Sequence, residues 1–501
     1  MTSSHIDAVV VGSGPNGLAA AITLAQAGIA VTVLEASDEV GGGLKSRESS
    51  VPGIVHDVGS AVHPLAAISP FLASLPLARH GLEWCRPDVD VAHPLDGGRA
   101  GVLLWSIDDT AAGLGRDGDA WRRTFAPLVA RFDELADGIF GPLLRMPRRP
   151  VTLARFGLRA LRPATVLARR FRTDEARALF GGTAAHQLQP LHRPATSAGA
   201  AMLIAAGHRV GWPVPAGGAQ ALTDALVGVL GDLGVKVETG VRVTNVDELT
   251  GARLVLFDTS PQAVVDIVGT RLPGRVRRAF ARYRHGPAAY KVDLVVEGGL
   301  PWTAAQCRRA GTVHLGGTLE EVARSEVEVH QGRMPERPFV VLAQPALSDP
   351  RRAVGDAQPI WAYAHVPRGY DGDATAAVLD QIERFAPGAR DRIVDTVVTP
   401  PAALEADNAN LRGGDIAGGA NDLRQLLFRP RVALDPYAIG VPGMYLCSAA
   451  TPPGGGVHGL CGHNAARHAL HHLDTFSALG EGASPPPTAP SKRGPESWPA
   501  F

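Results

Sequence analysis

The sequence predicts an α/β protein of more than one domain, whose first domain opens with a strand, a helix and a second strand. Residues 6–11 form a short apolar run rich in β-branched residues, which is typical of a strand buried on both faces of a parallel sheet. Residues 18–27 are rich in Ala and Leu and stop before Gly28, a residue type that commonly ends helices, and residues 30–34 form a second apolar run. At 501 residues the chain is also too long for one hydrophobic core.

The composition excludes several classes of protein. Hydrophobic residues make up 45% of the chain and charged residues 20%, as in a globular protein rather than a disordered one. Lys and Arg number 49, as do Asp and Glu, so no net charge attracts nucleic acid and we expect no nucleic-acid partner. No signal peptide and no apolar stretch of about 18 residues occur, so the expected compartment is the cytoplasm. The four cysteines form no CxxC pair, which indicates reduced thiols: Cys85, Cys307, Cys447 and Cys461.

The turn after residues 6–11 carries the pattern of a dinucleotide-binding site. Gly12, Gly14 and Gly17 form a GxGxxG motif that directly follows the expected strand and opens the expected helix. In such a turn the first glycine allows the bend, the second lets the backbone approach a pyrophosphate, and the third lets helix and strand pack closely. Glu35 ends the second strand, where a carboxylate accepts hydrogen bonds from ribose hydroxyls and repels a 2′-phosphate. The sequence therefore predicts a Rossmann-like domain that binds FAD or NAD.

A second GxGxxG pattern, at residues 113–118, lacks this context. A polar segment precedes it where a buried strand would be needed, so we interpret it as a loop without a ligand. The chain then has one dinucleotide fold and no separate nicotinamide domain. This arrangement favours FAD over NAD.

The remaining segments alternate between helix and strand patterns. Residues 120–210 read mainly as helices, and residues 235–243 alternate like paired strands. Residues 254–257 form another buried strand, which indicates a return to the first layer. Short strand patterns at residues 290–296 and 339–343 indicate a mixed sheet in a second domain.

Two further glycine-rich segments carry a family resemblance: residues 40–46 (VGGGLKS) and residues 444–459 (MYLCSAATPPGGGVHG). Together with the first turn they resemble the phytoene desaturase-like flavin-dependent oxidoreductases, and the likeness runs over nearly the whole chain. The branch with the closest likeness includes pyridine nucleotide-disulfide oxidoreductase domain-containing protein 2. Supporting segments are residues 217–218, 256–261, 290–293, 413–416 and 429–430.

The resemblance implies a two-domain fold, with a Rossmann-like, glutathione reductase-like FAD-binding domain and a discontinuous α+β substrate domain. FAD would lie extended across the first domain, and substrate would enter between the domains. The implied FAD-binding domain comprises residues 1–75, 208–275 and 436–478, and the substrate domain residues 76–207 and 276–435. Residues 479–501, rich in Pro, Ser and Gly, are expected to form a disordered tail.

The resemblance also implies which residues hold the cofactor. Many relatives have an Arg where this chain has Gly43, and the sequence leaves open whether Lys45 replaces it near the pyrophosphate. A helix expected to begin near residues 457–459 would present free N–H groups to the flavin, although a purely structural loop is the alternative. The cofactor-binding residues implied are Gly12, Gly14, Pro15, Asn16, Gly17, Glu35, Ala36, Gly42, Gly43, Lys45, Val243, Gly455, Val457, His458, Gly459 and Asn464.

Catalytic candidates are few, because flavin chemistry needs no protein nucleophile. His458 lies within the C-terminal motif, and His63 lies on a loop that approaches the flavin in relatives. For both, the alternative is a loop histidine that only bonds backbone. His463 could face the flavin or serve packing, and the case for His186 and His192 is weaker. His458 and His463 are five residues apart rather than four, so we expect no metal site.

A basic amphipathic pattern runs through residues 155–171. Arg155, Arg159, Arg162 and Arg169 would share one helical stripe, which could lie on a membrane surface. An ordinary solvated face is the alternative, since Pro163 interrupts the pattern.

These observations lead to one principal expectation and two alternatives. We expect an FAD-dependent oxidoreductase that acts on a hydrophobic small molecule by hydride transfer to flavin N5, with oxygen, a quinone or another external electron acceptor. One alternative is a flavin amine oxidase. The other is a flavoprotein with structural FAD that acts through a partner.

Overall fold

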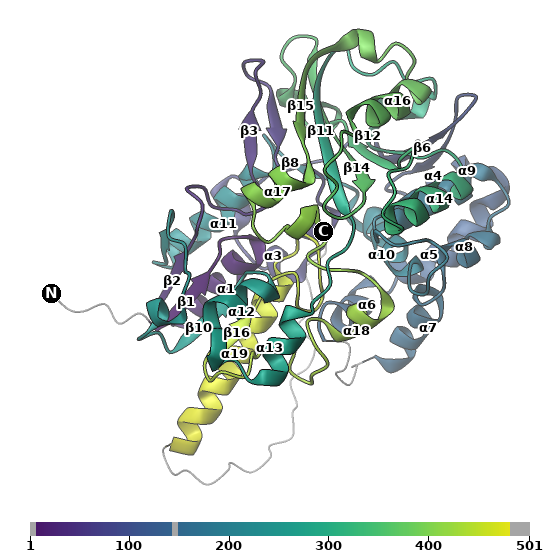
Figure 1. Cartoon of the computed structure of the whole chain (residues 1–501). Helices are drawn as coiled ribbons and strands as arrows, with labels where there is room; N and C mark the ends of the chain where they lie inside the picture. The colour runs from purple at the N-terminus through teal and green to yellow at the C-terminus, as the bar shows by residue number, and fades with distance from the viewer. Residues whose placement is uncertain (1–6, 143–148, 481–501) are drawn as a thin grey trace.

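The computed structural model describes residues 7–142 and 149–480 of the chain. The expected tail at residues 479–501 lies outside this range except for its first two residues, which end the last helix. The described residues form two sheets with helices around each (Figure 1).

The first sheet is a five-stranded parallel sheet built around the opening strand–helix–strand unit. Its side chains alternate between two apolar clusters, one under α1, α11 and α19 and the other under α12 and α13. These helices span Pro15–Gln26, Gln220–Asp232, Leu460–Gly480, Pro261–Val268 and Gly274–Ala281. The strands, in spatial order, are β16 (Met444–Leu446), β10 (Leu254–Phe257), β1 (Ala8–Val11), β2 (Val31–Leu34) and β9 (Lys236–Glu238).

The second sheet has seven strands and is mixed. Only the β6–β12 pair is parallel. In spatial order the strands are β15 (Ile393–Thr399), β11 (Ala288–Glu297), β14 (Ala357–Val366), β13 (Val340–Ala343), β12 (Ala310–Leu315), β6 (Val89–Leu95) and β7 (Arg99–Leu103).

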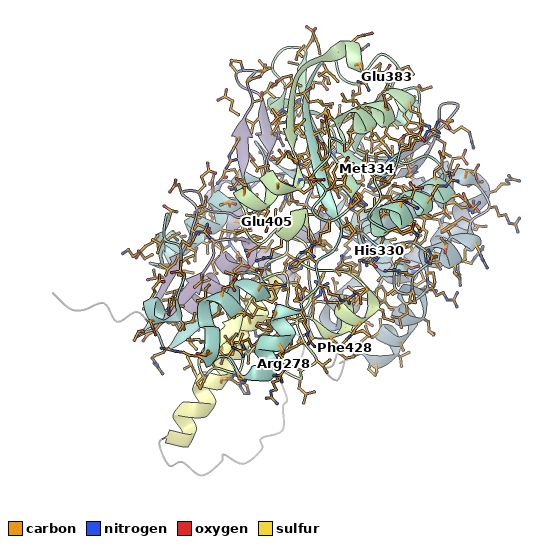
Figure 2. The ribbon with its side chains drawn as sticks, viewed as in Figure 1. Arg278, His330, Met334, Glu383, Glu405 and Phe428 are labelled. Atoms are coloured by element: carbon orange, nitrogen blue, oxygen red, sulfur yellow. The ribbon has the colours of Figure 1, made fainter. Side chains whose placement is uncertain are left out.

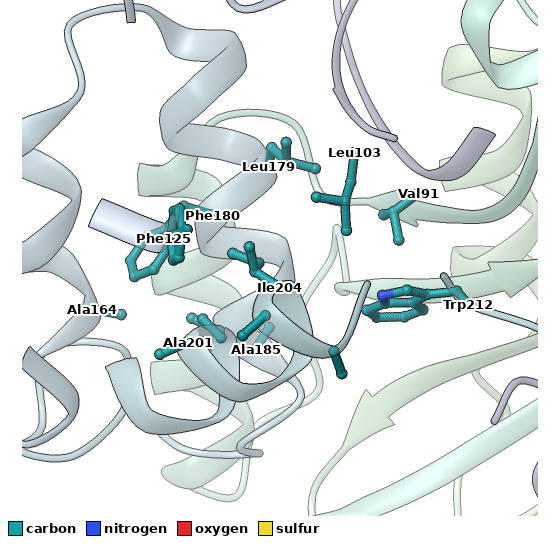
Figure 3. Close-up of a cluster of buried hydrophobic side chains, with 14 of the residues drawn as sticks. Val91, Leu103, Phe125, Ala164, Leu179, Phe180, Ala185, Ala201, Ile204 and Trp212 are labelled. Atoms are coloured by element: carbon teal, nitrogen blue, oxygen red, sulfur yellow. The ribbon is translucent and has the colours of Figure 1, made fainter. Parts of the chain in front are cut away.

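A layer of helices packs against one face of the second sheet, as predicted for residues 120–210. Figure 3 shows part of the apolar cluster between them, with Phe125 and Phe180 among the helices and Trp212 beside the strands. The other face packs against α16 (Thr375–Phe385). The helices of the layer are α4 (Ile107–Gly113), α5 (Gly118–Val129), α6 (Phe132–Ile139), α7 (Pro150–Ala160), α8 (Ala164–Leu167), α9 (Asp174–Ala185) and α10 (Ser197–Val210).

Shorter elements connect these layers. Two small antiparallel pairs join β3 with β4 and β5 with β8. The strands span Ser46–Glu48, Val55–Asp57, Trp84–Cys85 and Val214–Pro215. The helices are α2 (Pro64–Ala67), α3 (Pro70–Ala73), α14 (Leu319–His330), α15 (Pro345–Ser348), α17 (Pro401–Asp407) and α18 (Leu423–Phe428).

Three segments differ from the prediction or refine it. Residues 235–243 contain one strand, β9 at Lys236–Glu238, rather than paired strands. The chain turns at Gly240 (φ +71°), whose N–H donates to the Ser37 carbonyl. The second GxGxxG pattern lies at the junction of α4 and α5, away from any strand end. The basic pattern at residues 155–171 is divided between α7 and α8, because Pro163 caps the start of α8.

No helix in the described part of the chain is both long and apolar enough to span a membrane.

Candidate active site

One cavity of about 750 Å³ connects the two sheets, a size typical of ligand and cofactor sites. Its nucleotide half lies at the carboxyl ends of the parallel strands, where α/β sheets bind ligands. We call the other end the sheet half. The nucleotide half includes Gly12, Gly14, Asn16, Glu35, Lys45, Val243 and Asp258, and the sheet half includes His186, Leu203, Trp212, Ala289, Lys291, Thr312, Val341, Trp361 and Tyr363.

The glycine turn between β1 and α1 leaves no room for side chains. A Cβ at Gly14 would lie 2.7 Å from the Asp258 Oδ2 atom, and one at Gly42 would lie 3.0 Å from the Gly14 Cα atom. A Cβ at Gly17 would lie 2.1 Å from the Gly12 carbonyl oxygen, so Gly17 permits the close packing of helix on strand, as predicted. Two glycine turns thus face each other at the wall of the cavity.

The start of α1 is suited to an anion. Gly14 is its N-cap and has no side chain to cap the helix, while the N–H of Gly17 in the first turn donates to the Asp258 carboxyl (2.7 Å). The Asn16 Oδ1 atom is buried without a hydrogen-bond partner among the described residues, and both Pro15 and Asn16 line the cavity. Pro15 has no N–H, so the Asn16 N–H is the donor left for a ligand in this turn. Together with the positive end of the helix dipole, it suits this end of α1 to a pyrophosphate.

Glu35 lies at the end of β2, as expected for a ribose ligand. Its Oε2 atom accepts hydrogen bonds from the backbone N–H (2.8 Å) and the Oγ (2.7 Å) of Ser13, and its Oε1 atom accepts from the Ser37 N–H (2.8 Å). These bonds fix the carboxylate at the cavity wall, next to Ala36 and Val243. A carboxylate has about four acceptor sites, so after these three bonds about one remains for a ligand hydroxyl.

The second glycine turn brings Gly42, Gly43 and Lys45 to the cavity wall. The Lys45 side chain is buried, and its Nζ atom forms an ion pair with Asp407 Oδ2 (2.8 Å). Asp407 belongs to α17, the helix marked by Glu405 in Figure 2. The charge of Lys45 is therefore compensated within the protein. Whether Lys45 replaces the arginine of many relatives at the pyrophosphate was left open by the sequence, and the Asp407 ion pair shows only where its charge is compensated.

The C-terminal glycine loop contributes Gly455 and Val457 to the cavity lining, but His458, Gly459 and Asn464 are not among the lining residues. His458 is buried, and its Nδ1 atom accepts a hydrogen bond from the Leu460 N–H (3.0 Å), so the ring caps the start of α19. The Asn464 Nδ2 atom donates to the Phe140 carbonyl (2.8 Å). A Cβ at Gly459 would lie 3.0 Å from the Ala19 Cβ atom, so this glycine serves packing.

Two further histidines were considered from the sequence. His63 lines the cavity and is buried, and neither ring nitrogen has a hydrogen-bond partner among the described residues. Burial lowers the pKa of His63 to about 4, so the ring is neutral at pH 7. His463 serves packing, because its Nδ1 atom shares a hydrogen bond of 2.9 Å with the Thr23 hydroxyl of α1.

Sequence reasoning missed Asp258, which lies directly after β10. Its Oδ2 atom accepts a hydrogen bond from the Gly17 N–H (2.7 Å). Burial is the main cause that raises the pKa of Asp258 to about 7. The Gly17 hydrogen bond acts against this shift, and the nearby charge of Glu35 contributes to it. A polar residue directly after a buried parallel strand is the signal that could have indicated its position.

Lys291, Trp361 and Tyr363 were also missed, although the Lys291 segment entered the family resemblance. They occupy one face of the second sheet, in register on neighbouring strands β11 and β14. The Lys291 Nζ atom pairs with Asp293, and burial lowers the pKa of Lys291. The Trp361 Nε1 atom donates to the Gly59 carbonyl (3.0 Å), which connects the sheet half to the nucleotide half.

The site combines a glycine turn of the dinucleotide-binding type, an acid at the end of β2 and a second sheet that closes a shared cavity. These features define a class of protein, the two-sheet flavoprotein oxidoreductases. Residues 16–270, more than half of the chain, match the family described as flavin containing amine oxidoreductase, and the chain belongs to this family. It is therefore an FAD-dependent oxidoreductase with an α/β FAD-binding fold built on a parallel sheet.

Named relatives agree with this assignment. The chain is 26% identical to pyridine nucleotide-disulfide oxidoreductase domain-containing protein 2 of Mus musculus, over 93% of this chain and 94% of the relative. It is 26% identical to phytoene desaturase (neurosporene-forming) of Rhodobacter capsulatus, over 49% of this chain and 51% of the relative. A structure of putrescine oxidase bound to putrescine has the same fold, with a TM-score of 0.60 and 19% identity over 93% of this chain and 99% of that one.

Proposed function

We propose that this FAD-dependent oxidoreductase removes or relocates hydrogen on a hydrophobic small molecule, in the manner of a dehydrogenase or desaturase. The observation that carries the proposal is the chemistry of the sheet half. Its side chains are mainly apolar or aromatic, and the residues named for it include no carboxylate. A site of this kind binds neutral apolar molecules better than cations.

The nucleotide half is the proposed FAD site. Gly12, Gly14, Pro15 and Asn16 would hold the pyrophosphate and Glu35 the ribose hydroxyls. Gly42, Gly43 and Lys45 would complete this wall, Ala36 and Val243 would border the adenosine, and Gly455 and Val457 the flavin. The crowded glycine turns, the glycine N-cap of α1 and the unpartnered Asn16 Oδ1 atom support this fit.

When bound, FAD supplies a hydride acceptor at its N5 atom and returns the electrons to an external acceptor such as oxygen or a quinone. The sheet half would hold the substrate and exclude water through Val341, Trp361 and Tyr363. His63 is the proposed site histidine. Its buried neutral ring can donate a hydrogen bond to, or accept one from, a molecule bound at the cavity wall.

Amine oxidation is the second candidate, favoured by the family and by the fold shared with putrescine oxidase. An amine substrate enters as a cation and gains from an acidic partner. Asp293, the acid beside Lys291 of the sheet half, is already paired with that lysine, and Asp407 is paired with Lys45 of the nucleotide half. We therefore rank desaturase-like chemistry first.

We also propose the division into an FAD-binding domain (residues 1–75, 208–275 and 436–478) and a substrate domain (residues 76–207 and 276–435), in the glutathione reductase-like manner. All five parallel strands fall in the first set of segments and all seven strands of the mixed sheet in the second.

Peripheral contact with a membrane is a further part of the proposal. Leu158 and Leu161 are 69% and 52% exposed and alternate with Arg159 and Arg162 at the end of α7. Exposed apolar side chains flanked by arginines suit an anionic lipid surface. Flotation with phosphatidylserine vesicles tests this contact. Unchanged binding of an R159E/R162E/L158S/L161S variant would contradict it.

The test of the function begins with the absorption spectrum of the purified protein and identification of the released cofactor. FAD bands that bleach anaerobically on addition of apolar dehydrogenation substrates would support the proposal. Hydrogen peroxide release with primary amines, without bleaching by neutral substrates, would favour the amine oxidase alternative. FAD that no donor reduces would favour a structural cofactor.

A further inference from the structure

Polar side chains gather at the far end of the sheet half, on the face that lines the cavity. Lys291, Tyr363, Val341 and His314 form one row across four neighbouring strands, as their pairing shows. Lys291, Tyr363 and Val341 line the cavity, and His314 ends the row behind it. There His314 meets a second histidine, His186, which follows the last turn of α9.

His186 and His314 form a buried imidazole pair. Their Nε2 atoms share a hydrogen bond of 2.9 Å, and their ring centroids are 4.9 Å apart. His314 is fully buried, whereas His186 retains some accessible surface and lines the cavity. Burial, together with the neighbouring histidines, lowers the pKa of both rings, to about 3 for His186. Both rings are therefore neutral at physiological pH.

The surroundings indicate which ring donates in this pair. The His314 Nδ1 atom is buried with no hydrogen-bond partner in the described part of the chain, and so is the indole N–H of Trp212. The two rings meet edge to face, with centroids 5.9 Å apart. A proton on His314 Nδ1 would add a second unpaired buried donor there, and such donors are rare and costly. The favoured arrangement places the His314 proton on Nε2, where it is donated to His186 Nε2.

This arrangement fixes the remaining proton of His186. A neutral imidazole that accepts at Nε2 carries its hydrogen on Nδ1. No hydrogen bond occupies Nδ1 of His186 among the described residues. His186 thus holds one unused N–H donor at the wall of a cavity that is otherwise mainly apolar.

Helix α9 and two neighbouring histidines pack against the His186–His314 pair and hold it in place. A Cβ at Gly182 of α9 would lie 2.4 Å from the His93 Nδ1 atom and 3.1 Å from the His314 Cβ atom, so the helix rests directly on these rings. The His93 Nε2 atom bonds the Gly317 carbonyl (2.7 Å), and the His365 Nδ1 atom bonds Glu326 Oε1 (2.6 Å). A donor fixed by such packing binds a ligand without reorganisation.

We infer that the Nδ1–H group of His186 binds an oxygen of the substrate, and that the substrate is an apolar molecule with a neutral carbonyl or hydroxyl group. An ammonium has no lone pair to accept this hydrogen bond. A carboxylate at this end would be a buried charge beside no free cation of the sheet half, because Lys291, the cation named for that half, is paired with Asp293. The inference rests on the proposed function, since it assigns the substrate class of the same cavity.

The test compares octan-2-one with oct-1-ene, a matched pair in which only the ketone accepts a hydrogen bond. Affinities are measured on the purified holoprotein by tryptophan fluorescence, because Trp212 and Trp361 line the cavity. We expect the ketone to bind about tenfold tighter, which corresponds to one hydrogen bond. The infrared carbonyl band of the bound ketone should also move to lower frequency.

Substitutions then assign the effect to His186. H186F should reduce the ketone-to-alkene ratio to about one and abolish the infrared shift, whereas H186Q, which keeps an N–H donor, should retain part of both. H192F, a change at an exposed histidine outside the cavity lining, is the matched control. If H186F folds poorly, the ketone-to-alkene affinity ratio of H186Q and the infrared shift in the wild-type protein still test the hydrogen bond.

Several outcomes would overturn the inference. They are equal affinities for ketone and alkene in the wild type, tighter binding of octan-2-amine than of the ketone, no binding of either probe, or a ratio that survives H186F. Absence of FAD from the protein would instead contradict the proposed function. In that case the same fluorescence comparison on the apoprotein still tests the hydrogen bond.

Discussion

At the scale of single residues, Asp258 is the group whose charge matters most in the nucleotide half. The carboxyl is buried and lies under the glycine turn, where a pyrophosphate is expected. Its Oδ2 atom accepts a hydrogen bond from the N–H of Gly17, which is a neutral donor. An ionised Asp258 would therefore be poorly compensated and would repel a bound phosphate.

We predict that D258N changes the pH dependence of stability. The pKa of Asp258 rises from 3.8 in the unfolded chain to about 7 in the folded protein. Between these pH values the unfolded state binds fewer protons, so the residue's contribution to stability falls as pH rises and stays low above pH 7. One pKa unit is worth about 1.4 kcal/mol, so the loss is on the order of 4 kcal/mol. Asn keeps an oxygen for the Gly17 N–H.

Melting temperatures of the apoproteins across pH 4 to 8 provide the measurement. The variant should match the wild type near pH 4 and exceed it increasingly toward pH 8. D266N, which alters an exposed carboxylate of the same cavity, is the control and should leave the profile unchanged. A constant difference between D258N and the wild type at all pH values would contradict the raised pKa.

At the scale of elements, the nucleotide half depends on how α1 meets α19. A Cβ at Gly462 of α19 would lie 1.7 Å from the Asn16 carbonyl oxygen and 3.0 Å from the Ala20 N atom. The Thr23–His463 hydrogen bond lies along the same contact. The last helix of the described chain therefore holds the helix whose start forms the glycine turn.

We predict that G462A destabilises the protein and weakens FAD binding together. The new methyl group meets backbone rather than a flexible side chain, so the helices must separate, at a cost of about 1–3 kcal/mol or more. G231A on α11 is the matched control, because nothing lies within 4 Å of its Cβ, and it should stabilise by about 0.5–1 kcal/mol. Urea unfolding and FAD content measure the two effects. Normal values of both for G462A would show that α19 does not hold the turn.

The elements also show what the sequence could and could not predict. The first strand, its helix and the acid at the end of β2 depend on local patterns, and Gly12, Gly14 and Glu35 lie where the patterns indicate. The sheet half depends on register instead. Lys291, Tyr363 and His314 become neighbours only when strands up to 72 residues apart pair, and no local pattern specifies that pairing. Alternation of polar residues, as in Trp361, Tyr363 and His365, was the available signal.

In the C-terminal loop, the sequence motif suggested more site residues than line the cavity. Gly455 and Val457 of its motif line the cavity, but the next residue, His458, caps its own helix. A capping bond forms between neighbours in sequence and competes with any role in the site. A motif can therefore locate a loop without locating each side chain of that loop.

At the scale of the whole molecule, the two sheets are joined by contacts around the cavity. The Arg352 Nη1 atom donates to Asp57 Oδ2 (2.8 Å) in a fully buried ion pair, and Trp361 bonds the Gly59 carbonyl. These contacts link segments about 300 residues apart in the chain. A ligand that fills the cavity therefore stabilises the folded molecule rather than one local element.

We predict that removing FAD lowers the melting temperature and that added FAD restores it in a concentration-dependent way. A ligand at 100 times its Kd adds about 2.7 kcal/mol to the folded state. E35A should need about 10 to 100 times more FAD for the same shift, because it removes charged acceptors for the ribose. E39A, which changes another acid of the cavity lining, should titrate like the wild type. An apoprotein whose melting temperature does not respond to FAD, or an E35A variant that titrates like the wild type, would contradict the cofactor site at the end of β2.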